Sequence, residues 1–231
     1  MNKRAIISVG VGKWYGLGVR RLQRSLAEVG FNGKVFTWDG CYPPGSPTHE
    51  EVPDAFEAYA FKHAIEQGCT SILWLDSAAW AIKRPDPIFE IMEAEGAYMV
   101  LDGWNVGQWC KDSALKTLRL TREESFDITA MYGCILGVDY AHPKGKAFLD
   151  EFMAICMDGE TLKGYFPGAT GRKVEPGEVS NDPRVLGHAH EQTVAGALRH
   201  HHGFRLQAHK LFWLDGSQPH PKEAIILAGG L

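Results

Sequence analysis

Residues 71–80, SILWLDSAAW, decide the expected fold. Residues 72–75 are apolar and uncharged, which is typical of a short strand buried on both faces of a sheet. The run ends at Asp76, and open α/β sheets bind their ligands at the carboxyl ends of such strands. Asp76 could instead cap a helix, but Pro85 and Pro87 follow and no helical periodicity precedes them. We therefore expect Asp76 to be a functional carboxylate at a sheet edge.

Composition narrows the class of protein. The chain has 231 residues, 45% hydrophobic and 23% charged, which suits one well-buried α/β domain. A net charge of -4 argues against a protein that coats nucleic acid with its whole surface. The five cysteines form no CxxC pair, so neither a disulfide framework nor a zinc knuckle is expected. No apolar run reaches the ~20 residues of a membrane span. We expect a cytoplasmic protein.

The rest of the chain alternates between strand and helix patterns, which favours an α/β fold. Strands are expected at residues 5–9, 34–38, 71–75, 97–101 and 130–139, with shorter extended segments at 80–83, 204–207 and 224–227. Helices are expected at residues 19–29, 54–67, 85–93, 112–119, 143–157 and 188–199. Residues 158–187 are rich in glycine and proline and are expected to form a long loop, a feature that is usually functional.

Two loops carry further candidate residues. The first strand is followed by a glycine-rich loop with Lys13 and Tyr15, whose G-x-G-x3-G-x-G spacing does not match a dinucleotide fingerprint. Residues 103–109, GWNVGQW, combine aromatic and amide side chains, which suits stacking and hydrogen bonding to a sugar or a base. The alternative for the second loop is a surface segment whose tryptophans close the edge of the core.

Four motifs together resemble the GT-A nucleotide-sugar glycosyltransferases. They are the first strand and helix, the Phe61-Lys62 helix leading into residues 73–77 (LWLDS), the strand at residues 132–139 (YGCILGVD) and the helix start at residues 190–192 (HEQ), and the resemblance covers about residues 4–215. It implies a single Rossmann-like α/β domain over residues 1–231, with a mixed, mostly parallel central sheet flanked by helices. The donor-binding half would span about 1–102, and the acceptor and catalytic half about 103–231.

The resemblance also implies roles for individual residues in transfer from a nucleotide sugar, with UDP-glucose as a typical donor. Glu191 would act as general base in an inverting reaction or stabilise the reacting centre in a retaining one, together with Asp76. The implied donor-binding residues are Gly10, Gly12, Lys13, Tyr15, Trp38, Asp39, Lys62, Asp76 and Ser77. The implied acceptor-binding residues are Trp104, Asn105, Gln108 and His190.

The expected metal site departs from the family pattern. The family ends this strand with Asp-x-Asp, which binds the donor ribose and a divalent cation, but this chain has Asp76-Ser77-Ala78 and lacks the second acid. Either Asp76 binds Mn²⁺ or Mg²⁺ with His209 as a distant partner, or the protein works without a metal. A third alternative is a catalytically inactive module that binds carbohydrate or nucleic acid. A nucleotidyltransferase is a further alternative.

The acceptor stays open at this stage. The sequence is similar to compact glycosyltransferases of phages and metagenomic viruses, including those associated with Tet-type oxygenases. This similarity implies either a glycan acceptor or a 5-hydroxymethylated pyrimidine in DNA, such as 5-hydroxymethylcytosine, in the cytoplasm of a host cell. A duplex acceptor would need base flipping and phosphate contacts from a local basic cluster, which could be Arg20-Arg21-Arg24, Lys83-Arg84 or residues 199–202.

Overall fold

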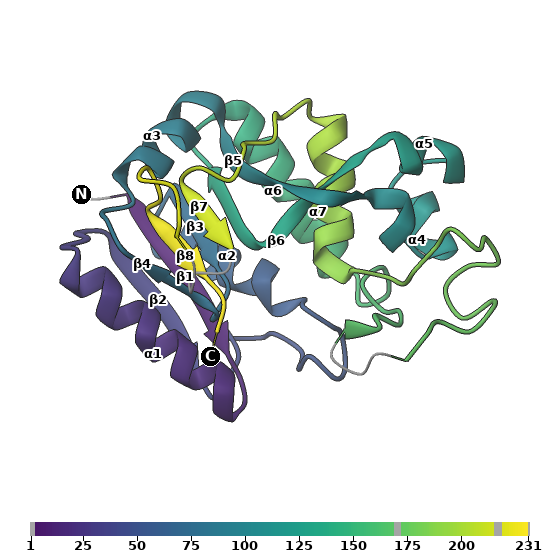
Figure 1. Cartoon of the computed structure of the whole chain (residues 1–231), viewed down its shortest axis with the longest axis horizontal. Helices are drawn as coiled ribbons and strands as arrows, with labels where there is room; N and C mark the ends of the chain where they lie inside the picture. The colour runs from purple at the N-terminus through teal and green to yellow at the C-terminus, as the bar shows by residue number, and fades with distance from the viewer. Residues whose placement is uncertain (1–2, 169–171, 215–218, 231) are drawn as a thin grey trace.

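The computed structural model describes residues 3–168, 172–214 and 219–230. Residues 71–75 form the expected strand, β3 (Ser71–Leu75), in the middle of a five-stranded sheet (Figure 1). The strands follow the order β2 (Lys34–Asp39), β1 (Arg4–Gly10), β3, β6 (Thr129–Asp139) and β5 (Ala97–Asn105).

The directions of the strands make the sheet mixed but mostly parallel. Strand β1 pairs in parallel with β2 and β3, while β6 pairs antiparallel with both β3 and β5. Four of the five strands therefore run the same way, and only β6 is reversed. This confirms the expected α/β fold with a mixed, mostly parallel central sheet.

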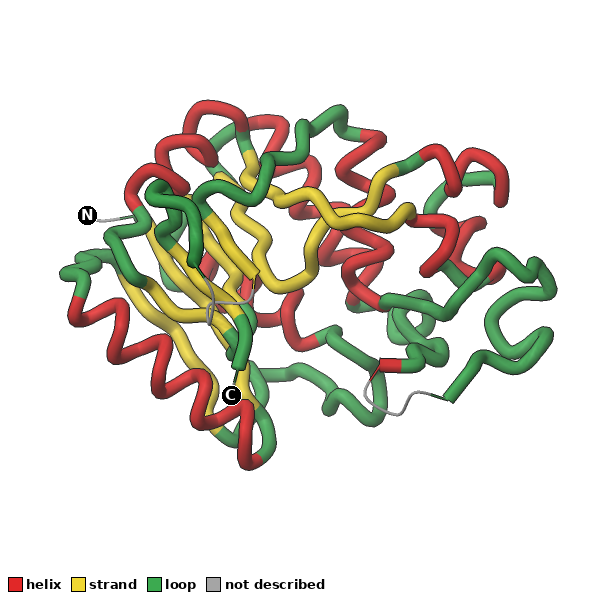
Figure 2. The backbone as a smooth tube through the Cα atoms, viewed as in Figure 1, coloured by secondary structure: helices red, strands yellow, loops and turns green. Residues whose placement is uncertain are grey.

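Helices cover both faces of this sheet, and Figure 2 shows them on either side of the strands. On one face, α1 (Lys13–Glu28) and α3 (Asp86–Glu95) pack with alternate side chains of β1 and β3 such as Ile6 and Leu73. On the other face, α2 (Phe56–Glu66), α6 (Pro143–Cys156) and α7 (His190–His201) pack with Ile72 and Trp74. All five β3 residues are buried, which explains the uninterrupted apolar run at residues 72–75.

A small second sheet joins the C-terminal region to the segment that follows Asp76. Its strands follow the order β4 (Ala79–Ala81), β8 (Ile226–Ala228) and β7 (Phe212–Leu214). Strand β4 pairs antiparallel with β8, and β7 pairs in parallel with β8. The apolar side chains of this sheet join the core on the α1 and α3 side of the molecule.

Several boundaries differ from the expectation. Helix α1 begins at Lys13 rather than near Val19, because Gly12 adopts φ +101° at its N-cap. Strand β5 continues to Asn105, because its pairing with β6 extends to Thr129, and the 3₁₀ helix η1 (Val106–Trp109) follows. The other short helices are α4 (Asp112–Thr117), which was expected, and α5 (Arg122–Asp127).

Besides η1, two short elements were not expected, and one expected strand does not form. Helix α5 starts with a capping box between Thr121 and Glu124, a signal that is visible in the sequence as Thr-x-x-Glu. Strand β7 has only three residues, too few for a clear pattern. Residues 204–207 form no strand, and Gln207 makes a single bridge to Val100. Across the described ranges, no helix combines the length and apolarity of a bilayer span.

We predict that Gly10→Ala destabilises the fold. A Cβ at Gly10 would lie 2.5 Å from the backbone oxygen of Tyr15 and 2.6 Å from Val19, so α1 would have to move away from β1. The expected loss is about 1–3 kcal/mol of unfolding free energy, measured by denaturant melts. Gly103→Ala is the matched control, because a Cβ added there would have no atom within 4 Å. Equal stability of the two variants would contradict this close packing.

Candidate active site

A cavity of about 800 Å³ opens at the carboxyl ends of β1, β3 and β5, between α2 and α7. Strand β6 is antiparallel, so its amino-terminal half, with Tyr132, Gly133 and Cys134, lies at the same edge and also lines the cavity. The cavity therefore occupies the position where open α/β sheets bind ligands. Figure 1 shows α7 and β6 beside one another, next to this edge.

Asp76 lies in the cavity wall at the end of β3, as expected. Its backbone N–H donates to Cys134 O at 3.0 Å, which fixes the turn of the chain. The Ser77 hydroxyl donates to Asp76 Oδ1 at 3.1 Å, and the Cys134 thiol lies 3.6 Å from Oδ2. Burial and the nearby Asp76 charge raise the pKa of Cys134 well above its usual value, so its thiol stays protonated and can donate to the carboxylate.

Glu191 reaches the cavity from the first turn of α7. Gly133 makes room for it, because a Cβ there would lie 3.0 Å from Glu191 Oε1. Burial and the neighbouring Asp54 carboxylate raise the pKa of Glu191 well above its ordinary value. The adjacent Gln192 donates to Asp102 at 2.8 Å, which ties the start of α7 to β5.

Asp54 is a central acid of the site that sequence reasoning missed. Its two carboxylate oxygens face two histidines, with His190 Nδ1 at 2.8 Å from Oδ2 and His49 Nδ1 at 3.0 Å from Oδ1. Burial alone would raise the pKa of Asp54, but the hydrogen bonds from His190 and His49 lower it well below its usual range. Asp54 and His190 are also two of the three non-glycine residues with positive φ among the described residues.

Glu57, one turn along α2, is a second acid that sequence reasoning missed. It is only 6% exposed and lines the cavity, and its carboxyl has no hydrogen bond or ion pair among the described residues. Burial, followed by the charges of Glu191, Asp54 and Asp76, raises its pKa well above normal. A signal was present in the sequence, because Glu57 shares the apolar face of its helix with Phe61 and Ala64 at spacings of four and seven residues.

Other expected site residues also line the cavity. Gly12 and Tyr15 lie at its β1 side, Ser77 follows Asp76, and Trp104 and His190 lie on the opposite side. Trp104 is 47% exposed and belongs to an aromatic cluster with Trp109 and Phe166. The ring centroids of Trp104 and Trp109 lie 5.7 Å apart, and those of Trp109 and Phe166 lie 5.3 Å apart. The structure therefore brings some of the expected donor-binding residues and some of the expected acceptor-binding residues to the wall of one cavity.

Four of the expected donor-binding side chains lie outside the cavity lining. Lys13 is exposed and lies over the Trp14 ring, and Asp39 pairs with Arg20 at the surface. Lys62 pairs with Glu66 on the exposed face of α2. Trp38 packs its ring against His63. Gly10 is also outside the lining, and its role in the structure is to let α1 pack closely on β1.

The remaining expected residues have structural partners. Asn105 and Gln108 form a capping box with each other around η1, with hydrogen bonds of 2.9 and 3.1 Å, and do not line the cavity. His209 lies behind Tyr132, with Nε2 2.6 Å from Leu101 O, and is not in the cavity wall. The structure therefore does not bring His209 together with Asp76 in the cavity.

A different group could hold a metal ion. Asp54, His190 and Glu191 each offer one ligand atom, and these atoms all lie within 4.8 Å of one another. None of the described residues of the surrounding wall is lysine or arginine, and the basic side chains that line it are His49 and His190, both paired with Asp54. Its acids are Glu50, Asp54, Glu57, Asp76, Asp102 and Glu191.

Comparison with known proteins finds similarity at the level of structure. No protein-family model matches the sequence, and no curated protein matches it either. Among solved structures, the chain is similar to the crystal structure of a glycosyltransferase involved in the glycosylation of the major capsid of PBCV-1, at 13% identity and a TM-score of 0.54. The match covers 97% of this chain and 92% of that chain. At this identity the similarity shows a shared fold over nearly the whole chain.

Proposed function

We propose that the protein is a glycosyltransferase that moves a sugar from a nucleotide-sugar donor, with UDP-sugars favoured, to a hydroxyl acceptor. The observation that carries this proposal is the cavity at the carboxyl edge of the sheet, with Asp76 and Glu191 both in its wall. The fold shared with a solved glycosyltransferase supports it. Asp76 and Ser77 would bind the donor on the β3 side, with Gly12 and Tyr15 beside them on the β1 side.

The segment after Asp76 does not fit a two-carboxylate cation site. Ala78 stands at the second acid position, and its carbonyl oxygen accepts a hydrogen bond from Arg21 at 2.6 Å. In our proposal the Asp76 carboxylate therefore accepts hydrogen bonds from the donor and does not bind a metal ion.

In this proposal Glu191 acts as the general base. A hydroxyl that attacks the anomeric carbon must lose a proton, and a cavity-facing carboxylate can accept it. Burial and the acidic surroundings raise the pKa of Glu191, which makes its carboxylate a stronger base than an exposed glutamate. In a retaining reaction the same carboxylate would stabilise the positive charge that develops on the sugar.

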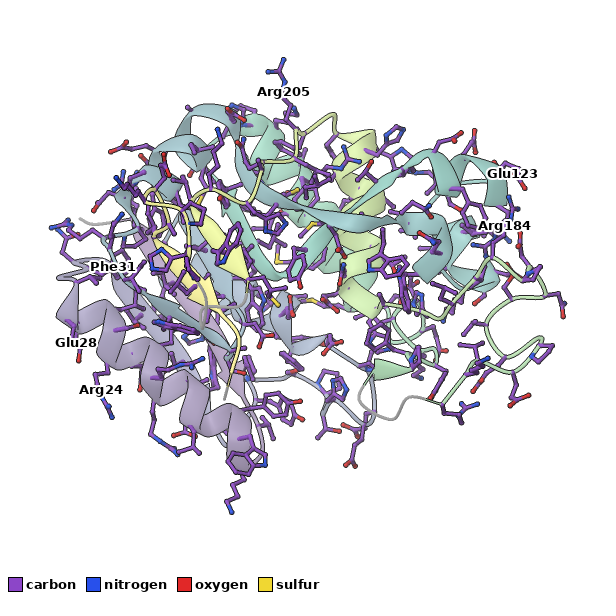
Figure 3. All side chains as sticks on the ribbon, in the orientation of Figure 1. Arg24, Glu28, Phe31, Glu123, Arg184 and Arg205 are labelled. Carbon is purple, nitrogen blue, oxygen red and sulfur yellow. The ribbon has the colours of Figure 1, made fainter. Side chains whose placement is uncertain are left out.

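We place a glycan first among acceptors and a hydroxymethylated DNA base second. Trp104 and Phe166, 47% and 43% exposed, offer apolar ring faces that suit a sugar ring. Of the first basic cluster proposed for phosphate contacts, Arg20 pairs with Asp39, and Arg21 donates to backbone carbonyls. Arg24 points outward from α1 into solvent (Figure 3).

We predict that Asp76→Asn and Glu191→Gln each reduce transfer by about 10²-fold or more while the fold survives, because each removes a charge at the reacting centre. Transfer is measured as nucleoside diphosphate release from a panel of nucleotide sugars with glycan and hydroxymethylated-DNA acceptors. Glu66→Gln, on the exposed face of α2, is the matched control. Full activity in folded Asp76 and Glu191 variants would refute the site assignment, and release of pyrophosphate would indicate a nucleotidyltransferase.

Trp104→Ala should weaken the acceptor and spare the donor. The loss of one stacking face is expected to raise the acceptor KM roughly fivefold to tenfold, equivalent to about 1 kcal/mol. Donor binding, followed by the shift in melting temperature with the nucleotide sugar, should stay unchanged. A change in donor binding with an unchanged acceptor KM would indicate that Trp104 contacts the donor and not the acceptor.

The pH dependence of transfer should report on Glu191. Because burial and Asp54 raise its pKa, the Glu191 carboxylate forms at a higher pH than that of an ordinary glutamate, and the rate of an inverting reaction should rise with pH above the ordinary glutamate range. The pH–rate profile of Glu191→Gln should lack this rise. A wild-type profile that matches that of Glu191→Gln would exclude Glu191 as the base.

A further inference from the structure

The first two turns of α1 place large apolar side chains in water and glycines against the sheet. Trp14 and Leu17 are 59% and 47% exposed, whereas Gly16 and Gly18 are buried. A Cβ added at Gly16 would collide with the carboxylate of Asp39, so the helix packs closely there because its inward residue is a glycine. The two bulky apolar residues of these turns therefore add little to the core.

The rest of α1 has the opposite, ordinary pattern. Leu22 and Leu26 are buried against the sheet, and Arg24 is exposed. Neighbouring large apolar side chains that a fold leaves in water indicate a surface that contacts another molecule. Tyr15, in the same first turn, is 56% exposed and also lines the cavity, so this surface lies beside the cavity opening.

The exposed face of α1 is also basic. Lys13, Leu17, Arg20 and Arg24 follow one another at spacings of four, three and four residues, which places them in one row along the helix. All four are exposed. Residues 13–27 contain four basic residues and no acid, although the whole chain has a net charge of -4. Positive charge is therefore concentrated on this helix.

Two cations of the row extend away from the body of the protein. Lys13 Nζ lies over the Trp14 ring, 5.3 Å from its centroid, so a cation and an indole ring stand side by side in solvent. Arg24 points outward from α1 (Figure 3). Arg20 is half exposed, and it pairs with Asp39.

This combination of side chains fits the surface of an anionic membrane best. Tryptophan favours the headgroup level, leucine favours the acyl boundary beneath it, and lysine and arginine attract anionic headgroups. The phosphate backbone of a nucleic acid would pair with the arginines, but it offers no apolar partner for Leu17. A neutral glycan would stack on Trp14 and leave the cations without a partner.

We propose that the α1 surface, which consists of Lys13, Trp14, Leu17, Arg20 and Arg24, binds the surface of a membrane that contains anionic lipids. Trp14 and Leu17 would enter the boundary between headgroups and acyl chains, and the basic side chains would contact headgroup phosphates. The cavity opening would then lie next to the membrane. The proposal does not rest on the proposed function, because membrane binding is measured without a donor or an acceptor.

The test is sedimentation of the whole protein with lipid vesicles. One set contains phosphatidylcholine alone, and the other contains phosphatidylcholine and phosphatidylglycerol at about three to one. We expect binding to the mixed vesicles, much weaker binding to phosphatidylcholine alone, and a loss of binding as salt rises from about 0.1 to 0.5 M.

Variants separate the apolar part of the contact from the electrostatic part. The double variant Trp14→Gln, Leu17→Gln should bind the mixed vesicles at least about 10-fold more weakly. Arg24→Gln should weaken binding about fivefold at low salt.

Matched controls change residues of the same kinds elsewhere. Leu186→Gln alters an apolar residue that is 37% exposed in the loop before α7, and Arg205→Gln alters an exposed cation far from α1 (Figure 3). Both should bind like the wild type. Every variant should keep the wild-type melting temperature, since all the changed side chains are exposed, and a loss of binding then does not reflect unfolding.

Three results would overturn the inference. The first is no sedimentation with the mixed vesicles at low salt, and the second is undiminished binding of the double variant. The third is tighter binding to duplex DNA that Arg24→Gln weakens and the double variant keeps, which would make this helix a nucleic-acid contact. If vesicles bind as described but no nucleotide sugar is turned over, the membrane contact stands and the proposed transferase function fails.

Discussion

Strand β6 runs antiparallel to β3, so the amino-terminal half of β6 lies beside the carboxyl end of β3. The pairing ends at Leu75 and Ile135, and the next hydrogen bond joins Asp76 N to Cys134 O. Gly133, one residue further, leaves the space that Glu191 occupies. A strand parallel to β3 at this position would place its carboxyl end, and not its amino-terminal half, at the cavity. The single reversed strand of the central sheet thus brings a residue that follows β3 and a residue of α7 into one wall, although they are far apart in sequence.

The parts of the fold that were predicted correctly depend on local patterns. The apolar run before Asp76 identifies β3, and Gly96, with φ +92°, ends α3. The cavity depends on distant contacts, so sequence spacing could not reveal that Asp54 meets His190 across 136 positions. Spacing also could not separate Lys62, which pairs with Glu66 at the surface, from a lysine that faces a ligand. The capping box of Asn105 and Gln108 was visible as Asn-x-x-Gln, but the same amides also suited an acceptor.

Burial of the acids in the candidate site costs free energy of folding, which the packing of the rest of the fold must offset. Glu57 and Glu191 have raised pKa values because each ionised form would be buried among other acids. Both lie on helices, α2 and α7, that pack their apolar faces into the same core beside β3 and β6. The acids are therefore held at fixed positions by hydrophobic burial. Such rigid support suits a binding site, because electrostatic groups act best when they do not reorganise on binding.

Hydrogen bonds of one arginine connect residues 229–230 to the segment that follows Asp76. Arg21 of α1 donates to the carbonyl oxygens of Gly230 at 2.7 Å, Gly229 at 3.2 Å and Ala78 at 2.6 Å, and its guanidinium lies over the Trp80 ring. Figure 1 shows this end of the chain beside α1. Displacement of Gly229 and Gly230 would therefore disturb the same guanidinium that holds the carbonyl oxygen of Ala78, the residue two positions beyond Asp76.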